Sequence, residues 1–306
     1  MASAPRELAD YHDEPQQLPS GSFGKCAFLR LGFEAQPDRS AGRSVLRTLH
    51  RRAPLLVQQA LYWDEEMPGL PCVYMISNSG GILQGDRYGI EIDLEAGAQA
   101  HVTTQAATKI HSMDANYATQ TQTFTLGANS YLEYIPHPLI PHASSRFVQH
   151  TRVSIDPSAT LIYSEILMAG RKYYGSGELF LYDLFSSTLH ASRPDGESLF
   201  TEKYLIEPRR HSVARLGAMG SFHVYGSLVV LTPKQHAERL FEVIDPRFDS
   251  TSDLVFGVSH LPHDAGLILK VLGLETASVN AALRRFWSQA RQEVAGASVP
   301  DNFLWG

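Results

Sequence analysis

Apolar and polar residues alternate along much of the chain after residue 24, which predicts a protein built mainly from β-strands. In the clearest case, 90–95, isoleucine and leucine alternate with acidic residues, so one face of the strand is apolar and the other is polar. Other short runs are rich in the β-branched and aromatic residues that favour strands. They lie at 100–104, 119–126, 131–135, 147–155, 161–167, 179–184, 200–206 and 222–231.

Turn-forming sequences recur between these strands at an almost even spacing. Three of them, at 95–98, 126–129 and 156–159, follow one another about every thirty residues, and each precedes an apolar strand. A repeat of this length fits stacked β layers, as in a solenoid, but ordinary meandering hairpins give the same spacing. The sequence leaves both arrangements open.

Helical periodicity appears only in the C-terminal half. Thr232 is placed to cap a first helix, with Pro233 in its first position and Gln235 completing a capping box. A second helix is predicted over 276–294, with apolar residues three and four positions apart and Gly296 as its end. The predicted fold class is therefore mainly β (α+β): a large multi-stranded body, solenoid-like if the layers stack, with two α-helices in the C-terminal half.

Composition predicts one globular domain. Residues 1–21 are polar and aperiodic, so we expect a flexible N-terminal lead-in, then a β-rich domain over 22–296 and a C-terminal tail over 297–306. The chain is 43% hydrophobic and 19% charged, enough apolar material for a real core. Cys26 and Cys72 are too few for a disulfide framework, which fits a reducing compartment, and the sequence leaves a single bridge between them open.

Charge and hydropathy argue against two classes of partner. The net charge is −6 and long blocks of Lys and Arg are missing, so the chain lacks the electrostatic pattern of a nucleic-acid-binding protein. The N-terminus lacks the apolar core of a secretory signal, and no stretch reaches the roughly 18 apolar residues that cross a bilayer. We therefore expect a cytoplasmic protein with neither nucleic acid nor membrane as its partner.

The run from Gly80 to Asp86 is the most glycine-rich loop of the first half. It contains Gly81 and Gly85 but matches neither the dinucleotide-binding nor the P-loop pattern, and a strand rather than a helix follows it. The simpler interpretation is a tight turn in which Asp86 accepts hydrogen bonds from backbone amides, and the alternative is direct contact with a metal.

The 13 histidines suggest a metal site, because imidazole and carboxylate groups suit a borderline divalent ion such as nickel. His137 and His142 form a local pair in a Pro-containing segment. Without a third ligand such a pair implies at most weak, exchangeable binding, and an incidental surface pair is the simpler interpretation.

Glu133 and Glu165 each lie inside an otherwise apolar predicted strand. Either they face solvent, as alternation allows, or they are buried, and a buried carboxylate needs partners and would mark an internal polar path. Arg171 and Glu178 flank a Gly-rich turn, where either an ion pair closes the loop or Glu178 handles metal or docks a partner.

Taken in order, a series of segments resembles the UreD (UreH) family of urease accessory proteins. The series spans roughly residues 25–295 and is specific as an ordered set rather than through any one member. It consists of Gly80, Gly81, Gly85 and Asp86, 103–109 with Lys109, 132–136 with Glu133, 140–141, 164–166 with Glu165, Gly170 and Arg171, Gly177 with 178–180, 257–259 and 261–262. The chain departs from the family at 78–79 and Gln84, and in having His137 and His142.

The resemblance implies a non-enzymatic urease maturation factor with a β-rich fold and two helices. It implies a scaffold and nickel conduit that binds apo-urease and the helical accessory protein UreF, which in turn recruits the nickel-carrying GTPase UreG. It implies no permanently bound cofactor, only transient nickel(II). The residues that it suggests for the nickel path are Asp86, Glu133, Glu165 and Glu178, with His137 and His142 as additional candidates.

Two other functions stay open on the sequence. A β-rich hydrolase with paired carboxylates would need Glu133 and Glu165 about 5–9 Å apart in an open cleft. A purely structural module would hold urease open while no metal passes through it.

Overall fold

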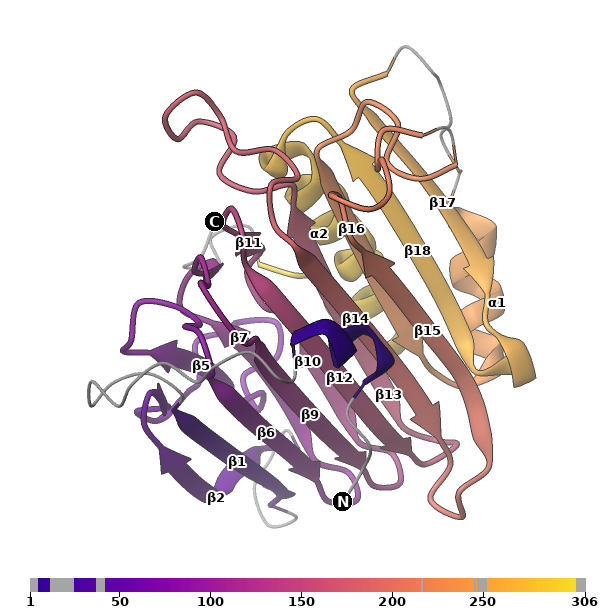
Figure 1. The fold of residues 1–306 in the computed structure, drawn as a ribbon. Coiled ribbons are helices and arrows are strands. Elements are labelled where there is room, and N and C mark those ends of the chain that lie inside the picture. The colour runs from indigo at the N-terminus through magenta and orange to yellow at the C-terminus, as the bar shows by residue number, and fades with distance from the viewer. Residues whose placement is uncertain are drawn as a thin grey trace.

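Two β-sheets pack face to face in the computed structural model of the protein, which describes residues 5–11, 25–36, 42–215, 217–244, 246 and 252–300 (Figure 1). The 7-stranded sheet consists, in spatial order, of β15 (Ser198–Ile206), β14 (Leu184–Ser192), β12 (Arg146–Ile155), β9 (Ala118–Leu126), β6 (Arg87–Leu94), β1 (Cys26–Ala35) and β2 (Ser44–Arg52). The main path of the 11-stranded sheet consists of β17 (Leu254–His260), β18 (Gly266–Gly273), β16 (Val224–Leu231), β13 (Thr160–Met168), β10 (Tyr131–Tyr134), β7 (Gln99–Thr104), β5 (Cys72–Ser77) and β3 (Leu55–Leu56). Its remaining strands are β4 (Ala60–Leu61), β8 (Thr108–Ile110) and β11 (Leu139–Pro141).

The middle of the chain winds into stacked coils. β6, β9 and β12 lie parallel in the 7-stranded sheet, and the strands that follow them, β7, β10 and β13, lie parallel in the 11-stranded sheet. The three predicted turns between the sheets also stack, since the Gly97 N–H donates to Ala128 O at 2.8 Å and the Asp156 N–H donates to Leu126 O at 3.0 Å. The stacked arrangement is therefore present here, and antiparallel pairs occur toward the ends of the two sheets.

Apolar side chains from both sheets fill the layer between them. In β6, Tyr88, Ile90, Ile92 and Leu94 are buried and alternate with partly exposed residues, as the sequence predicts. A second apolar core lies on the other side of the 11-stranded sheet, beneath α1 (Lys234–Val243) and α2 (Thr276–Ala295). Because this sheet is covered on both faces, β10 and β13 are buried along nearly their whole length.

The prediction of a mainly β fold with two helices in the C-terminal half is confirmed. α2 begins at Thr276 as predicted, and Gly296 ends it with φ +68°, in the left-handed region that glycine favours. The predicted cap of α1 is wrong. Its N-cap is Pro233, and the Thr232 hydroxyl instead lies 2.9 Å from the hydroxyl of Thr160 at the start of β13.

The predicted strand at 179–184 is also wrong. β14 starts only at Leu184, and the preceding residues form a loop in which Phe180 has φ +55°. The Phe180 N–H donates to Ala169 O at 2.7 Å, so the loop is tied to the end of β13 rather than paired with a neighbouring strand.

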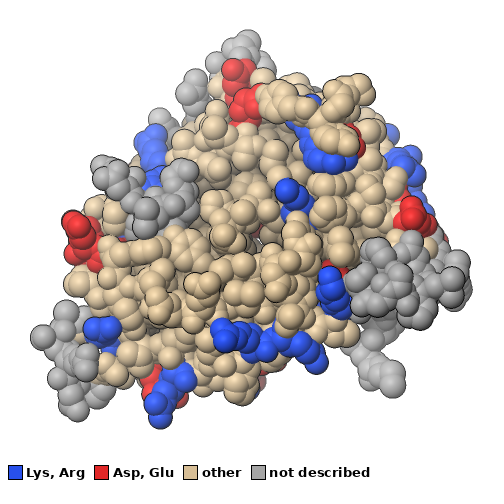
Figure 2. All heavy atoms as spheres, turned by 90° about the vertical axis from the view of Figure 1, so that its left-hand side faces the viewer, with Lys and Arg blue, Asp and Glu red and all other residues tan. Residues whose placement is uncertain are grey.

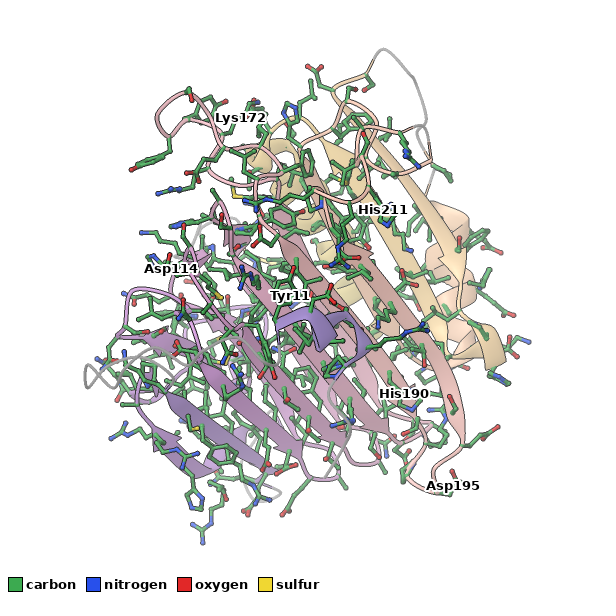
Figure 3. The ribbon with its side chains drawn as sticks, in the orientation of Figure 1. Tyr11, Asp114, Lys172, His190, Asp195 and His211 are labelled. Carbon is green, nitrogen blue, oxygen red and sulfur yellow. The ribbon has the colours of Figure 1, made fainter. Side chains whose placement is uncertain are left out.

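The N-terminal segment contributes a short 3-10 helix, η1 (Arg6–Tyr11), that lies across the outer face of the 7-stranded sheet (Figure 3). Leu8 is fully buried there, and the Arg146 guanidinium lies 4.5 Å from the centre of the Tyr11 ring. Most of the remaining predicted lead-in lies outside the described residues. At the other end, Ala297 and Val299 of the predicted tail are buried.

Both cysteines are free thiols, Cys26 exposed and Cys72 buried. None of the helices that the described residues form has the length and apolarity to span a membrane. Figure 2 shows the left-hand side of Figure 1, where the Lys and Arg side chains of the described residues are scattered rather than gathered into one basic patch.

Close stacking of the coils leaves no room for a side chain at Gly127, in the turn after β9. A Cβ there would lie 2.9 Å from Ala96 N and 3.1 Å from Leu94 O, backbone atoms of the neighbouring coil. We expect Gly127→Ala to lower the free energy of unfolding by about 1–3 kcal/mol, measured by urea unfolding followed by circular dichroism. Gly257→Ala is the matched control, because its Cβ would meet nothing within 4 Å. Equal effects of the two changes would contradict close stacking.

Candidate functional site

A cavity of about 270 Å³ lies between the two sheets. One end is lined by exposed residues, among them Gly80, Gln105 and Lys109, and is therefore the open end. Five buried polar residues of the lining come from two successive coils: Gln122, Tyr134, Gln149, Tyr163 and Glu165. The interior of the stacked coils is thus polar along one row, although most of the layer is apolar.

Hydrogen bonds link the row across the coils. The Thr151 hydroxyl donates to Gln122 Oε1 at 2.6 Å, and Gln122 Nε2 donates to the Tyr134 hydroxyl at 2.5 Å. In the next coil Gln149 Nε2 donates to the Tyr163 hydroxyl at 3.2 Å. The Tyr134 and Tyr163 rings stack at 5.6 Å. Each polar group is therefore satisfied within the row, which removes most of the cost of burying it.

Glu165 ends this row and is buried, with 4% of its surface exposed. Its carboxyl accepts hydrogen bonds from Ser187 at 3.1 Å, from Tyr163 at 3.2 Å, and from Gln149 and Tyr204. Burial raises the pKa of Glu165, and the hydrogen bonds from Tyr204 and Ser187 do not cancel that effect. With neutral donors around it, this carboxyl holds a proton more readily than a free glutamate.

Glu133 has the opposite environment, on the other face of the 11-stranded sheet. It is fully buried, and Arg291 of α2 donates to both its oxygens, at 2.7 and 3.0 Å. His101 lies 2.8 Å from Oε2, and the Tyr131 hydroxyl donates to Oε1 at 2.5 Å. Burial alone would raise the pKa of Glu133, but the charge of Arg291 and the hydrogen bond from His101 hold it well below its usual range.

The same arginine joins two further parts of the chain. Arg291 donates to Asp64 Oδ2 at 2.6 Å and to Ser298 O at 3.1 Å, and its side chain is fully buried. Glu133 is therefore part of an ionic cluster that fixes α2 to the sheet. Of the two interpretations that the sequence left open for Glu133 and Glu165, burial is the one observed for both.

The two carboxylates do not share a cleft. Glu133 meets α2 on one side of the 11-stranded sheet, whereas Glu165 meets β14 and β15 on the other side. The hydrolase alternative needs both groups to flank one bond in an open cleft. This arrangement does not provide that geometry.

Asp86 caps the glycine-rich loop. Its carboxylate accepts the N–H of Lys25 at 3.0 Å and the N–H of Leu83 at 2.9 Å, and the side chain is fully buried. Each oxygen thus already has a backbone donor, as expected for a turn. A direct contact of Asp86 with metal stays a prediction.

Glu178 closes the loop after β13. Arg171 donates to its two oxygens at 2.7 and 2.6 Å, and this hydrogen-bonded pairing lowers the pKa of Glu178. His142 lies close to this pair, where burial and the charge of Arg171 lower its pKa to about 4. The partner of His142 is His111, whose ring centre lies 4.8 Å away, rather than His137.

His137 lies at the other end of β11 from His142. It lines the interior cavity, and it also lines a second cavity of about 490 Å³ between the 11-stranded sheet and α2. Among the described residues, no group forms a hydrogen bond with its buried Nε2. Burial lowers its pKa, which favours the neutral imidazole.

No cluster of three or more His, Cys, Asp or Glu side chains suited to a metal ion occurs in the described part of the chain. Of the six predicted nickel-path residues, Glu178 and His142 lie close together, and no third predicted ligand joins them in the described part of the chain. Only Glu165 and His137 line the interior cavity. The metal roles of all six stay predictions.

Comparison with known proteins agrees with the resemblance. A family model for the UreD urease accessory protein matches residues 25–306. A UreD 2 urease accessory protein of Brucella suis is 70% identical over 305 residues, covering all of both chains. UreD proteins of Photorhabdus laumondii and Yersinia enterocolitica are 50% and 49% identical, each covering 98% of this chain and 92% of its own length.

The chain belongs to the UreD family of urease accessory proteins. Members of this family serve urease maturation as accessory proteins and not as catalysts. The positions of Glu133 and Glu165 and the family membership thus both argue against the hydrolase alternative.

The glycines of the UreD motifs have positive φ, and two of them also make close backbone contacts. A Cβ at Gly81 would lie 2.5 Å from Lys109 O, and one at Gly170 would lie 2.3 Å from Glu178 O. Both have positive φ, as do Gly80, Gly85 and Gly177. These positions shape the loops around the open end of the cavity and after β13.

Sequence reasoning missed two residues of this UreD family member that matter locally. Arg291 lies on a predicted helix, 158 residues from Glu133, and no local pattern connects them. His111 follows β8 and becomes a neighbour of His142 through the pairing of Ile110 with Pro141. The position of His111 at a strand end was the only available signal.

Removing Arg291 leaves Glu133 and Asp64 buried without their cation. We therefore expect Arg291→Met to lower the free energy of unfolding by about 3–5 kcal/mol, measured by urea unfolding of the purified chain. Arg285→Met, on the exposed face of the same helix, should change it by less than about 0.5 kcal/mol. Similar values for both would show that the buried cluster does not hold α2.

The lowered pKa of Glu133 predicts an acid-dependent loss of stability. Its ionised form stabilises the fold fully above the ordinary pKa of 4.5, and this contribution is lost as the pH falls below that value toward the lower folded-state pKa. Glu133→Gln should be less stable at pH 7 and should lose less additional stability between pH 5 and pH 3. The measurement is urea unfolding across this pH range, and parallel curves for both proteins would refute the assignment.

Proposed function

We propose that this UreD family member acts in the cytoplasm as scaffold and nickel conduit in urease maturation. In this proposal it binds apo-urease and UreF, and UreF in turn recruits the GTPase UreG. A GTP-dependent change in UreG releases nickel(II), which passes through the interior of this protein to the urease active site. The observation that carries the proposal is the polar row lining the cavity between the two sheets.

The chemistry of this row suits an ion that must move on. Amide, phenol and hydroxyl oxygens are weak ligands for a late first-row divalent ion, and conduction requires sites that release what they bind. Glu165 is the one carboxyl in the lining, and its raised pKa strengthens the competition between a proton and nickel there. Such competition weakens retention further.

The scaffold part of the proposal is supported by exposed apolar groups near the end of β13. Tyr173 is 82% exposed, Tyr174 is 58% exposed and Leu181 is 47% exposed, all within or just after one projecting loop. Lys172 of this loop is labelled at the top of Figure 3. Tyrosine supplies large, rigid contact area in protein interfaces, so this loop suits contact with a partner protein.

The first test is co-expression of urease and its accessory proteins with and without this protein. We expect urease made without it to contain little nickel and to be inactive, whereas the full set yields nickel-loaded enzyme. Pull-down should recover this protein together with urease and UreF. Fully nickel-loaded, active urease in its absence would overturn the proposed function.

A large side chain that blocks the open end of the cavity distinguishes a nickel conduit from a purely structural module that holds urease open. Ala107 lines the cavity there and is partly exposed, so the large side chain of Ala107→Trp should fill the opening. We expect the complex to form while nickel incorporation into urease falls. Thr125→Trp, exposed on the outer face of β9, is the matched control and should leave nickel delivery unchanged. Normal nickel incorporation into urease with Ala107→Trp would favour the purely structural module.

A further inference from the structure

We propose that nickel(II) passes between the interior cavity and the groove beneath α2 by crossing the 11-stranded sheet at His137. This inference rests on the proposed function, since it assumes that nickel travels through the protein. It adds the route, and it assigns to His137 the role of the ligand at the crossing.

The crossing lies where the sheet is interrupted in two neighbouring coils. β7 ends at Thr104 and β8 begins at Thr108, while β10 ends at Tyr134 and β11 begins at Leu139. The two interruptions lie side by side, because the Thr108 N–H donates to Pro138 O at 2.9 Å. Between them the regular strand pairing is interrupted, and we place the crossing of the ion there.

The linings of the two cavities share residues at this interruption. Pro136, His137 and Ile166 line both of them. The neighbouring residues of β13 diverge, since Ser164 lines the groove beneath α2 and Glu165 lines the interior cavity. The sheet is therefore one layer thick between the two spaces, and His137 is the titratable group common to both linings.

A route through the protein also needs two openings. The interior cavity opens near Gly80 and Gln105, and the groove beneath α2 is lined by the exposed residues Asn280 and Ala281. Joined at His137, the two spaces form a passage with an opening at each end. The exposed residues in the lining of the interior cavity lie at one end of it, so without the crossing this cavity has a single opening.

His137 has the properties of a transient nickel ligand. Its backbone N–H donates to Thr104 Oγ1 at 2.9 Å, which holds the residue in place. Its Nε2 is buried and, within the described residues, without a hydrogen-bond partner, an arrangement that costs free energy unless something binds there. One neutral imidazole, with water completing the coordination, binds a borderline divalent ion weakly enough to release it.

The test uses the complete urease maturation system and three tryptophan plugs. Ala107→Trp fills the open end of the interior cavity, His137→Trp fills the crossing and Ala281→Trp fills the groove, with Thr125→Trp as the control. Nickel per urease is measured by mass spectrometry of the metal, and recovery of the complex by pull-down confirms that each variant folds and assembles. We expect the three plugs, and not the control, to abolish most nickel incorporation.

The outcomes separate this inference from the proposed function. If Ala107→Trp blocks nickel delivery while His137→Trp and Ala281→Trp do not, the conduit stands and the crossing is refuted. If none of the three plugs has an effect on an intact complex, the conduit itself fails.

The ligand role has its own variant, in case tryptophan at position 137 prevents folding. His137→Ala removes the imidazole without blocking the passage, so activation should need at least about tenfold more nickel in the medium and should recover at excess nickel. His150→Ala, a partly exposed residue of β12, is the matched control. An unchanged nickel requirement with His137→Ala would overturn the assignment of His137.

Discussion

The parallel register of the stacked coils is the constraint on which the rest of the structure depends. Because each strand of one coil pairs with the equivalent strand of the next, side chains at matching positions form rows that run across the coils. Gln122 of β9 thus pairs in register with Thr151 of β12, and the row continues through Tyr134 and Tyr163. A polar row inside an apolar layer is tolerated because each member bonds another. The register that builds the core therefore also builds the lining of the cavity.

Two buried glutamates on one sheet show how the surroundings decide what a carboxyl does. Glu133 has a buried arginine against it and stays ionised, so it belongs to the framework that fixes α2. Glu165 has only neutral donors and keeps its proton more readily. The pair of Glu133 and Arg291 stabilises the fold as a unit, since removing either partner leaves a buried uncompensated charge. At Glu165 a proton competes with a metal ion, which is why we place the interior part of the proposed nickel path on that side of the sheet.

The 11-stranded sheet is covered on both faces, and this gives the proposed path its two compartments. The 7-stranded sheet closes one and α2 covers the other, while the interruptions beside His137 lie between them. No deep metal site is needed for such a path, and a deep site would hold the ion rather than pass it on.

The sequence by itself determined the mainly β class, the two helices, most strand positions and the family, because alternation, helix periodicity and turn chemistry are local and the motif series runs along the whole chain. It also singled out Glu133 and Glu165 as carboxylates that need partners if buried. It did not determine whether the repeating turns stack or what covers each face of a strand. Alternation shows which side chains share a face, but not which other element packs against that face. Only the tertiary structure decided that Arg291 pairs with Glu133, that backbone amides donate hydrogen bonds to the Asp86 carboxylate and that His137 lines two cavities. Those contacts join residues far apart in the chain, and long-range packing alone brings them together.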